Sequence, residues 1–270
     1  MLSTRKEHLT RGNCEPFGEL APGFVGRSFV SGKTGALNLS TGTITLAPGA
    51  VLPYHTHGYS EALTILDGEF TVTVEARRYC LRKLDCIHIP GGVLHTATNR
   101  SSMPVLAHWA FPVAQPSRLF VKAEFKIIER DLGLPEKGDP EHVVRFDQAE
   151  VYTLAPGTEF RDLFGHRFGS KGICGGYGEF APGTGLPCHT HHFDESITII
   201  NGKATCQVAG RSYQLANCDT AMVPTGLPHR FLNQGHEPMS MVWVYAGDAP
   251  ERTLVDPGCC SKMAREPIAN

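Results

Sequence analysis

The stretch GAVLPYHTHGYSEALTILDG at residues 49–68 returns as GTGLPCHTHHFDESITIING at residues 183–202, with every position shifted by 134 residues. A histidine further along the chain, His95, returns at the same shift as His229. An internal repeat of this length indicates two copies of one structural unit. The repeated residues of interest are His55, His57, Glu61 and His95 in the first copy, and His189, His191, Glu195 and His229 in the second.

The repeat extends beyond these residues in both directions. Leu-Ala-Pro-Gly at 20–23 recurs at 154–157, and Trp109 recurs as Trp243. The turn residues of the first copy also recur, namely Gly49, Gly68, Pro90, Gly92 and Asn99, as Gly183, Gly202, Pro224, Gly226 and Asn233. For 270 residues this predicts two domains of ordinary size. We expect an N-terminal barrel over 1–111, a linker over 112–150, a C-terminal barrel over 151–246 and a tail over 247–270.

The composition excludes several classes of protein. The 41% hydrophobic and 19% charged residues are typical of a folded globular chain, and the net charge of −2 gives no attraction to nucleic acid or to acidic membranes. No apolar run is long enough to span a membrane, and the N-terminus lacks the apolar centre of a secretory signal. None of the nine cysteines repeats at the shift of 134, so we expect mostly buried free thiols in a cytoplasmic protein. For the adjacent Cys259 and Cys260 we expect free thiols in a tail, with redox or metal-capturing activity as the alternative.

Alternation of apolar and polar residues predicts an all-β protein with short strands. Asp67-Gly68 and Asn201-Gly202 predict type I′ hairpin turns, and a second hairpin is expected near Glu75-Ala76 and Ala209-Gly210. The only helix that we expect in the linker lies around 122–131, before Gly133 and Pro135.

The repeated histidines and glutamate predict a metal site in each copy. Residues two apart in a strand share a face, so His55 and His57 point the same way, while His95 arrives from a distant strand. Three neutral imidazoles and one carboxylate suit a divalent first-row transition metal and leave the loaded site with a charge of about +1. Such a site favours an anionic ligand. Four protein ligands fill a tetrahedral zinc ion, whereas Fe(II), Mn(II) and Ni(II) accept six ligands. We therefore expect one metal per barrel, Fe(II) or Mn(II) in preference to Ni(II) or Zn(II).

These segments resemble the two conserved motifs of the cupin superfamily. The first, G-x5-H-x-H-x3-E-x6-G, is met at 49–68 and 183–202, and the second, P-x-G-x2-H-x3-N, at 90–99 and 224–233. The resemblance implies a bicupin: two tandem double-stranded β-helix (jelly-roll) barrels with few short helices. One departure is that Leu84 and Cys218 occupy the place of the leading glycine of the second motif. This concerns a turn and leaves the ligands intact.

The resemblance leaves the reaction open, because a fold does not determine a function. Our leading hypothesis is a non-haem metal dioxygenase, an oxidoreductase that binds O2 and a small organic acid, enol or diketone-like substrate, with Glu61 or Glu195 also able to take a proton. The alternatives are a redox-neutral metal-dependent cyclase, isomerase or decarboxylase, and a binding protein without chemistry. We expect a small-molecule substrate as the partner, and either a monomer with an internal pseudo-dimer or a homodimer.

Other residues have structural and functional interpretations. Tyr59, His192 and Asp194 differ between the copies and could assist the metal, although strand parity turns His192 and Asp194 away from it. For the remaining polar candidates, His88, His108, Asn99 and Asn233, we expect structural roles. Leu63, Ile65, Ile197 and Ile199 share the ligand face, and together with Trp109 and Trp243 they are expected to be core residues that could also line a pocket.

Overall fold

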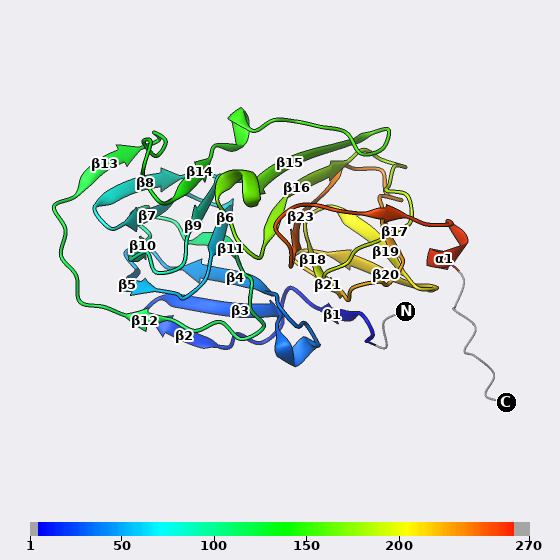
Figure 1. The fold of residues 1–270 in the computed structure, drawn as a ribbon, viewed down its shortest axis with the longest axis horizontal. Helices are drawn as coiled ribbons and strands as arrows, with labels where there is room; N and C mark the ends of the chain where they lie inside the picture. The colour runs from blue at the N-terminus through cyan, green and yellow to red at the C-terminus, as the bar shows by residue number, and fades with distance from the viewer. Residues whose placement is uncertain (1–4, 262–270) are drawn as a thin grey trace.

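The computed structural model describes residues 5–261 and confirms an all-β protein made of two barrels (Figure 1). Each barrel consists of two facing antiparallel sheets, apart from one parallel edge strand in the N-terminal barrel. The helices are short, as expected, and comprise η1 (Gly32–Thr34), η2 (Phe146–Gln148), η3 (His166–Phe168) and α1 (Gly258–Ser261).

The N-terminal barrel contains a seven-stranded and a six-stranded sheet. The larger sheet has the spatial order β14 (His142–Val144), β9 (Cys86–Ile89), β6 (Glu61–Asp67), β11 (Val105–Phe111), β4 (Ser40–Leu46), β3 (Phe24–Val30) and β2 (Gly18–Ala21). The smaller sheet has the order β12 (Leu119–Phe120), β5 (Val51–Thr56), β10 (His95–Thr98), β7 (Phe70–Val74), β8 (Arg77–Leu81) and β13 (Ile128–Asp131).

The C-terminal barrel repeats this plan with a six-stranded and a five-stranded sheet. The larger sheet has the order β1 (His8–Thr10), β21 (Thr220–Val223), β18 (Glu195–Asn201), β23 (Met239–Tyr245), β16 (Cys174–Phe180) and β15 (Thr158–Phe164). The smaller sheet has the order β20 (Arg211–Ala216), β19 (Lys203–Val208), β22 (His229–Leu232), β17 (His189–Thr190) and β24 (Thr253–Leu254).

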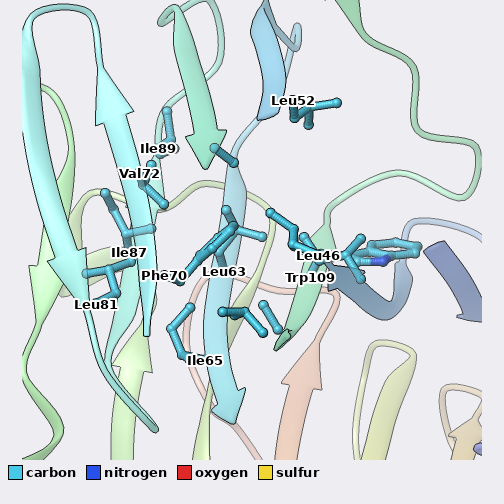
Figure 2. Packing of buried hydrophobic residues seen from close by; sticks show 14 of the residues in the cluster. Leu46, Leu52, Leu63, Ile65, Phe70, Val72, Leu81, Ile87, Ile89 and Trp109 are labelled. Carbon is cyan, nitrogen blue, oxygen red and sulfur yellow. The ribbon is translucent and has the colours of Figure 1, made fainter. Parts of the chain in front are cut away.

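Each barrel has its own apolar core, and a third apolar cluster joins the two. In the N-terminal barrel, residues of both sheets such as Leu63, Val72 and Trp109 pack between the strands (Figure 2). The third cluster combines residues of the first repeat, such as Val30 and Ala110, with Phe164 and Val244 of the second. Because Phe164 and Val244 are the repeat equivalents of Val30 and Ala110, the barrels pack through matching faces, as the subunits of a symmetric dimer do.

The strand that precedes each repeat is donated to the other barrel. β1, near the N-terminus, pairs with β21 of the C-terminal barrel, and β14, which precedes the second repeat, pairs with β9 of the N-terminal barrel. The register is equivalent, with His8 opposite Met222 and His142 opposite His88. This reciprocal exchange ties the two barrels together by backbone hydrogen bonds as well as by apolar contact.

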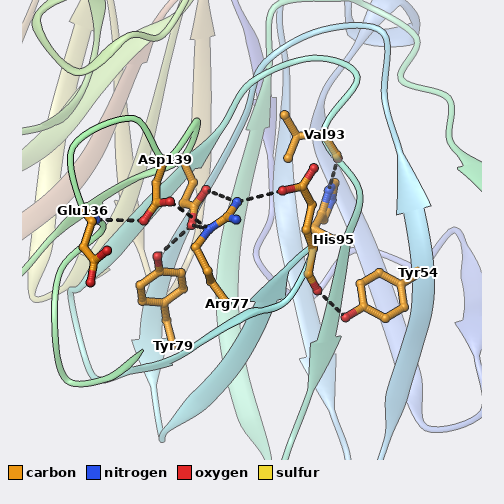
Figure 3. A network of polar contacts seen from close by, with 9 residues as sticks. Tyr54, Arg77, Tyr79, Val93, His95, Glu136 and Asp139 are labelled. Atoms are coloured by element: carbon orange, nitrogen blue, oxygen red, sulfur yellow. Dashed lines mark hydrogen bonds and ion pairs between the residues drawn. The ribbon is translucent and has the colours of Figure 1, made fainter. Parts of the chain in front are cut away.

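Charged residues fix both exchanged strands. Glu141, beside β14, accepts hydrogen bonds from Arg77 Nε and Tyr79 Oη, both at 2.7 Å, and Figure 3 shows that Arg77 also contacts Asp139. Its repeat equivalent Glu7 contacts Arg211 and Tyr213 in the same way. The Glu141 side chain is 0% exposed, so its charge depends on these partners.

A second ion pair secures each exchanged strand further along. Asp85 and Asp219 follow the two positions where the expected glycine is missing, and they bind Arg145 and Arg11, respectively, at 2.7 Å. The residues at those positions, Leu84 and Cys218, adopt left-handed backbone with φ of 68° and 65°. A glycine would take this conformation without steric cost, so these are turn positions at which the glycine of the motif fits. The absence of that glycine changes the turn and leaves the metal ligands unaffected.

The structure confirms the predicted hairpins near Glu75 and Ala209 but not those predicted at Gly68 and Gly202. Glu75 and Ala209 have positive φ and connect paired strands, β7 with β8 and β19 with β20. By contrast, the prediction of a type I′ hairpin at Asp67-Gly68 and Asn201-Gly202 was wrong. β6 and β7 lie in different sheets, as do β18 and β19, and only the glycines have positive φ. These turns therefore carry the chain across the barrel from one sheet to the other.

The prediction of a helix around 122–131 was also wrong. Residues 122–127 have no regular structure, and β13 at 128–131 pairs in parallel with β8. Edge pairing of backbone groups to the sheet supplies the hydrogen bonds that a helix would have made internally.

The expectation of free thiols fails for Cys260, because it forms a disulfide with Cys188, next to the candidate ligand His189. The argument from cysteine usage to a reducing compartment therefore does not extend to this pair. The side chain of Cys259 lies outside those that the structure describes. Among residues 5–261, no helix is long and apolar enough to cross a membrane.

Candidate metal centres

The structure brings His55, His57, Glu61 and His95 together inside the N-terminal barrel. β5 carries His55, and β10 begins at His95, which lies directly opposite His55 in the antiparallel ladder. Glu61 is the first residue of β6 in the other sheet, so the cluster bridges the two sheets. One potential ligand atom of each residue lies within 4.8 Å of the others, and all four residues are buried.

The second cluster reproduces this arrangement in the C-terminal barrel. His189 on β17 lies opposite His229 on β22, and Glu195 is the first residue of β18. The four ligand atoms, including that of His191, again lie within 4.8 Å of one another. The repeat in the sequence is therefore a repeat in the geometry of the cluster.

Backbone carbonyl groups orient the imidazole rings of the first cluster. In each ring the Nδ1–H group donates a hydrogen bond to a backbone carbonyl. His55 donates to Pro53 O at 2.9 Å, His57 to Ser117 O at 2.5 Å and His95 to Val93 O at 3.0 Å. This assigns the proton of each ring to Nδ1 and leaves the Nε2 lone pair for the interior. Such hydrogen bonds are typical of histidines that bind metal ions. His189, His191 and His229 contact Pro187 O, Glu251 O and Leu227 O in the same way.

The atoms at the centre of each cluster are buried and lack hydrogen-bond partners among the described residues. In the first cluster they include His57 Nε2, His95 Nε2 and Glu61 Oε2, and Glu61 Oε2 lies only 2.8 Å from His95 Nε2. In the second, Glu195 Oε2 lies 2.6 Å from His229 Nε2. Buried polar atoms without partners are costly, and a cation at the centre would satisfy all of them.

The charge states of His55, His189 and Glu195 also fit a cation. Burial, reinforced by His95, lowers the pKa of His55 to about 3, and burial with His229 does the same for His189. Burial opposes ionisation of Glu195, but the neighbouring His229 and His191 hold its pKa at about 2. Neutral imidazoles and an ionised carboxylate are the forms that bind metals. Each barrel thus has a site for one divalent transition metal ion.

The two clusters differ in the space beside them. A cavity of about 460 Å³ opens onto His55, Glu61 and His95, whereas the space beside the second cluster is about 20 Å³. Larger side chains fill the second pocket: Tyr152, Phe160, Phe231 and Met241 stand where the first repeat has Gly18, Gly26, Ala97 and Ala107. The first barrel can admit an organic ligand to its metal site, and the second has room for little more than a water molecule.

A strap that follows each barrel's last long strand covers its site. In the straps, β12 pairs with β5 and β24 pairs with β17. The backbone carbonyls of Ser117 and Glu251 in these straps accept hydrogen bonds from His57 and His191, respectively. Arg118 lines the first cavity, and its repeat equivalent Arg252 lines the second. Neither arginine was predicted as a site residue, although Pro116-x-Arg118 and Pro250-x-Arg252 repeat at the same shift.

The residues that differ between the copies near the ligands have structural contacts. The Tyr59 hydroxyl donates to Ser117 O at 2.8 Å, which holds the strap over the first site. Asp194 points away from the cluster, as strand parity predicts, and binds Arg5 at 2.7 Å, while His192 is exposed. His88 contacts Ser60 at 3.2 Å.

Other candidates fall into the roles expected from the sequence. His108 lies 3.4 Å from Thr198 of the other barrel, and Asn99 binds loop carbonyls at Leu46 and Met103. Asn233 does the same at Phe180 and Glu237. Ile65 and Ile199 are core residues, whereas Leu63, Ile197, Trp109 and Trp243 also line the pockets.

Curated relatives match only part of the chain. It is 33% identical over 102 residues to the auxin-binding protein ABP19b of Prunus persica and 33% identical over 103 residues to germin-like protein 1 of Brassica napus. Each match covers 36% of this chain, and the chain spans about half the length (48%) of these relatives.

Solved structures match almost the whole fold. An oxalate decarboxylase of Bacillus subtilis covers 94% of this chain and 80% of its own, with a TM-score of 0.76 and 17% identity. The oxalate decarboxylase of Lactobacillus farciminis, solved with formate, covers 94% and 90%, with a TM-score of 0.75 and 14% identity. At these identities the likeness establishes the fold alone.

The family model described as the cupin domain matches twice, at residues 42–111 and 176–245. These matches contain both metal-binding clusters. The chain therefore belongs to the cupin family, and it is a bicupin.

Proposed function

We propose that this bicupin is a metal-dependent enzyme that carries out a redox-neutral reaction on a small organic acid in its N-terminal barrel. The observation that carries the proposal is the cavity of about 460 Å³ beside the first cluster, compared with about 20 Å³ beside the second. A substrate needs access to the metal, and only the first site offers it. The second site then stabilises its barrel, as closed metal sites do.

In this proposal His55, His57, Glu61 and His95 bind one metal ion, and His189, His191, Glu195 and His229 bind the other. Mn(II) or Fe(II) is preferred because a six-coordinate ion would keep two positions for substrate. When bound, the ion supplies Lewis-acid polarisation of a carboxylate or carbonyl oxygen.

The remaining tasks belong to side chains of the first cavity. Tyr59 and His57 hold the strap in place, and apolar walls that include Leu63 and Trp109 exclude water from the reacting group. Glu61 is the only acidic residue among the described lining residues, so we assign to it any proton transfer within the cavity. Glu195 faces a filled pocket, and we assign it to metal binding alone.

The likeness to oxalate decarboxylases supports the redox-neutral alternative better than the dioxygenase that we first expected. Mn(II) centres are named for the Bacillus subtilis enzyme, whose structure gives a TM-score of 0.72 over 94% of this chain. A decarboxylation breaks a carbon–carbon bond without net oxidation. A dioxygenase, by contrast, consumes one O2 for each substrate molecule.

The test is a stoichiometry measurement on Mn(II)-loaded full-length protein. A panel of carboxylic and keto acids, oxalate included, is incubated under air while substrate loss, CO2 release and O2 uptake are followed together. We expect substrate loss without equivalent O2 uptake. One O2 consumed per substrate would overturn the redox-neutral proposal in favour of a dioxygenase, and absence of turnover with bound acid recovered unchanged would favour a binding protein.

A further inference from the structure

We infer that the ligand of the N-terminal cavity is a monocarboxylate with an extended apolar body, and that Arg118 pairs with its carboxylate. The inference rests on the proposed function only in placing the ligand in the first barrel. It assigns to Arg118 a specificity role that is separate from metal binding.

Arg118 is held in place over the cavity without a charged partner. The Nε atom of its guanidinium is buried and has no hydrogen-bond partner, and no carboxylate of residues 5–261 lies within salt-bridge distance of it. The backbone beside it is fixed on both sides, because His57 and Tyr59 hold Ser117 while Leu119 pairs with Thr56. A partly buried guanidinium without a counter-ion is unfavourable, so an anionic ligand would gain from pairing with it.

The charge around the cavity favours an anionic ligand. Glu61 is the only described acidic lining residue, and it is taken up by the metal cluster, whereas Lys33 adds a second cation on an exposed position. With a divalent ion and neutral imidazoles, the site has a charge of about +1 before Arg118 is counted. A carboxylate is therefore attracted into this cavity, and a neutral or cationic head group is not.

The rest of the cavity is apolar and larger than a carboxylate requires. Phe24, Leu63, Trp109 and Phe111 form its walls, and Phe17 packs edge-on against Trp109 at 6.4 Å between ring centroids. A volume of about 460 Å³ falls in the range of sites for organic ligands of moderate size. A two-carbon acid would leave these walls in contact with water, so we assign the remaining space to a hydrocarbon portion of the ligand.

The second barrel supplies a matched control. Arg252 occupies the position equivalent to Arg118, beside a pocket of about 20 Å³ in which Phe231 replaces Ala97. If a strap arginine only stabilised the barrel, substitutions at the two positions would have similar effects. If it binds ligand, only Arg118 matters for binding.

The experiment measures binding without any chemistry. Isothermal titration calorimetry with Zn(II)-loaded full-length protein compares acetate, butanoate, hexanoate and octanoate, with 1-octanol as the uncharged probe. We expect one binding site per chain and an affinity that rises about fourfold for each added methylene group. Arg118→Gln should weaken octanoate binding by about tenfold or more without changing the dependence on chain length or the binding of 1-octanol, and Arg252→Gln should change neither.

Several outcomes would overturn the inference. These are affinity independent of chain length, two sites per chain, or equal binding by the Arg118→Gln and wild-type proteins with Zn(II) content unchanged. The result is separable from the proposed function. If octanoate binds as expected but no acid is turned over, only the enzymatic proposal fails, whereas turnover of oxalate without binding of the longer acids would refute this inference alone.

Discussion

The two barrels have the same metal-binding residues on the same strands, yet among the described residues only the N-terminal cluster has room beside it for an organic ligand. Registers such as His95 opposite His55 and His229 opposite His189 are equivalent, and the imidazole rings are oriented by equivalent carbonyls. The cavities differ more than twentyfold in volume. The backbone repeat therefore determines where the metal binds, and a few side chains on the barrel walls determine whether a substrate can reach it.

The largest difference between the barrels should appear when each glutamate ligand is removed. Glu61→Gln should lower turnover on the order of 100-fold or more, because it changes both a metal ligand and the only acidic residue among the described lining of the cavity. Glu195→Gln should keep most of the activity. Elemental analysis and substrate-loss assays check this, and each variant should lose one metal ion per chain. Equal losses of activity in the two variants would contradict a division between a catalytic and a structural site.

The cavity itself can be removed by copying a residue from the other barrel. Ala97→Phe introduces the residue found at position 231 and should abolish ligand binding and turnover while both metal ions remain. The converse, Phe231→Ala, should cost about 3–5 kcal/mol of unfolding free energy because it empties a filled core. Calorimetric binding and urea denaturation measure the two effects. Normal ligand binding by Ala97→Phe would show that the cavity is not the binding site.

The exchanged strands provide a smaller contrast in stability. Glu141→Ala removes the buried acceptor that Tyr79 and Arg77 share, although Arg77 keeps Glu75 and Asp139, and should lower the free energy of unfolding by about 3 kcal/mol. Glu7→Ala should cost less, because its partner Arg211 is 37% exposed and can be hydrated. Chemical denaturation curves give both values. A larger loss of unfolding free energy for the Glu7 variant would mean that burial does not determine how much each ion pair contributes to stability.

Sequence reasoning located the two ligand sets because metal ligation needs fixed residue types at a fixed spacing, and the turns around them repeat with them. It could not place the exchanged strands β1 and β14, each only three residues long, because their pairing is made with residues far away in the chain. Glu7-His8 and Glu141-His142 do repeat at the same shift, so the repeat in the sequence includes the start of both exchanged strands.

The cavity was harder to predict than the ligands. Its volume depends on side chains from several strands, among them Leu52, Ala97 and Trp109, that come together only in the fold. Strand parity indicated that Leu63 could face a pocket, but it could not show whether the opposite wall was empty or filled. The disulfide of Cys260 was missed because neither of its cysteines has a repeated partner.

The smallest contrast concerns acid stability at the interface between the barrels. Burial lowers the pKa of His108 from 6.5 to about 3, so between these values the unfolded chain binds a proton that the folded chain does not. Stability from this residue is therefore present at neutral pH and decreases as the pH falls below 6.5, by about 2 kcal/mol between pH 7 and pH 5.

Val242 occupies the equivalent position in the second repeat, so His108→Val gives both barrels the same residue at this position of the interface. The variant should lose less stability between pH 7 and pH 5 than the wild-type protein, as measured by denaturation at each pH. An unchanged dependence on pH would show that other groups account for it.

The most direct test of the account is a crystal structure of the Mn(II)-loaded full-length protein with octanoate, with anomalous scattering used to locate manganese. We predict one manganese ion at each cluster and octanoate in the N-terminal barrel alone, with its carboxylate against Arg118. A missing ion at either cluster, or octanoate bound equally beside both, would contradict the claim that the barrels share a metal site and differ in access to it.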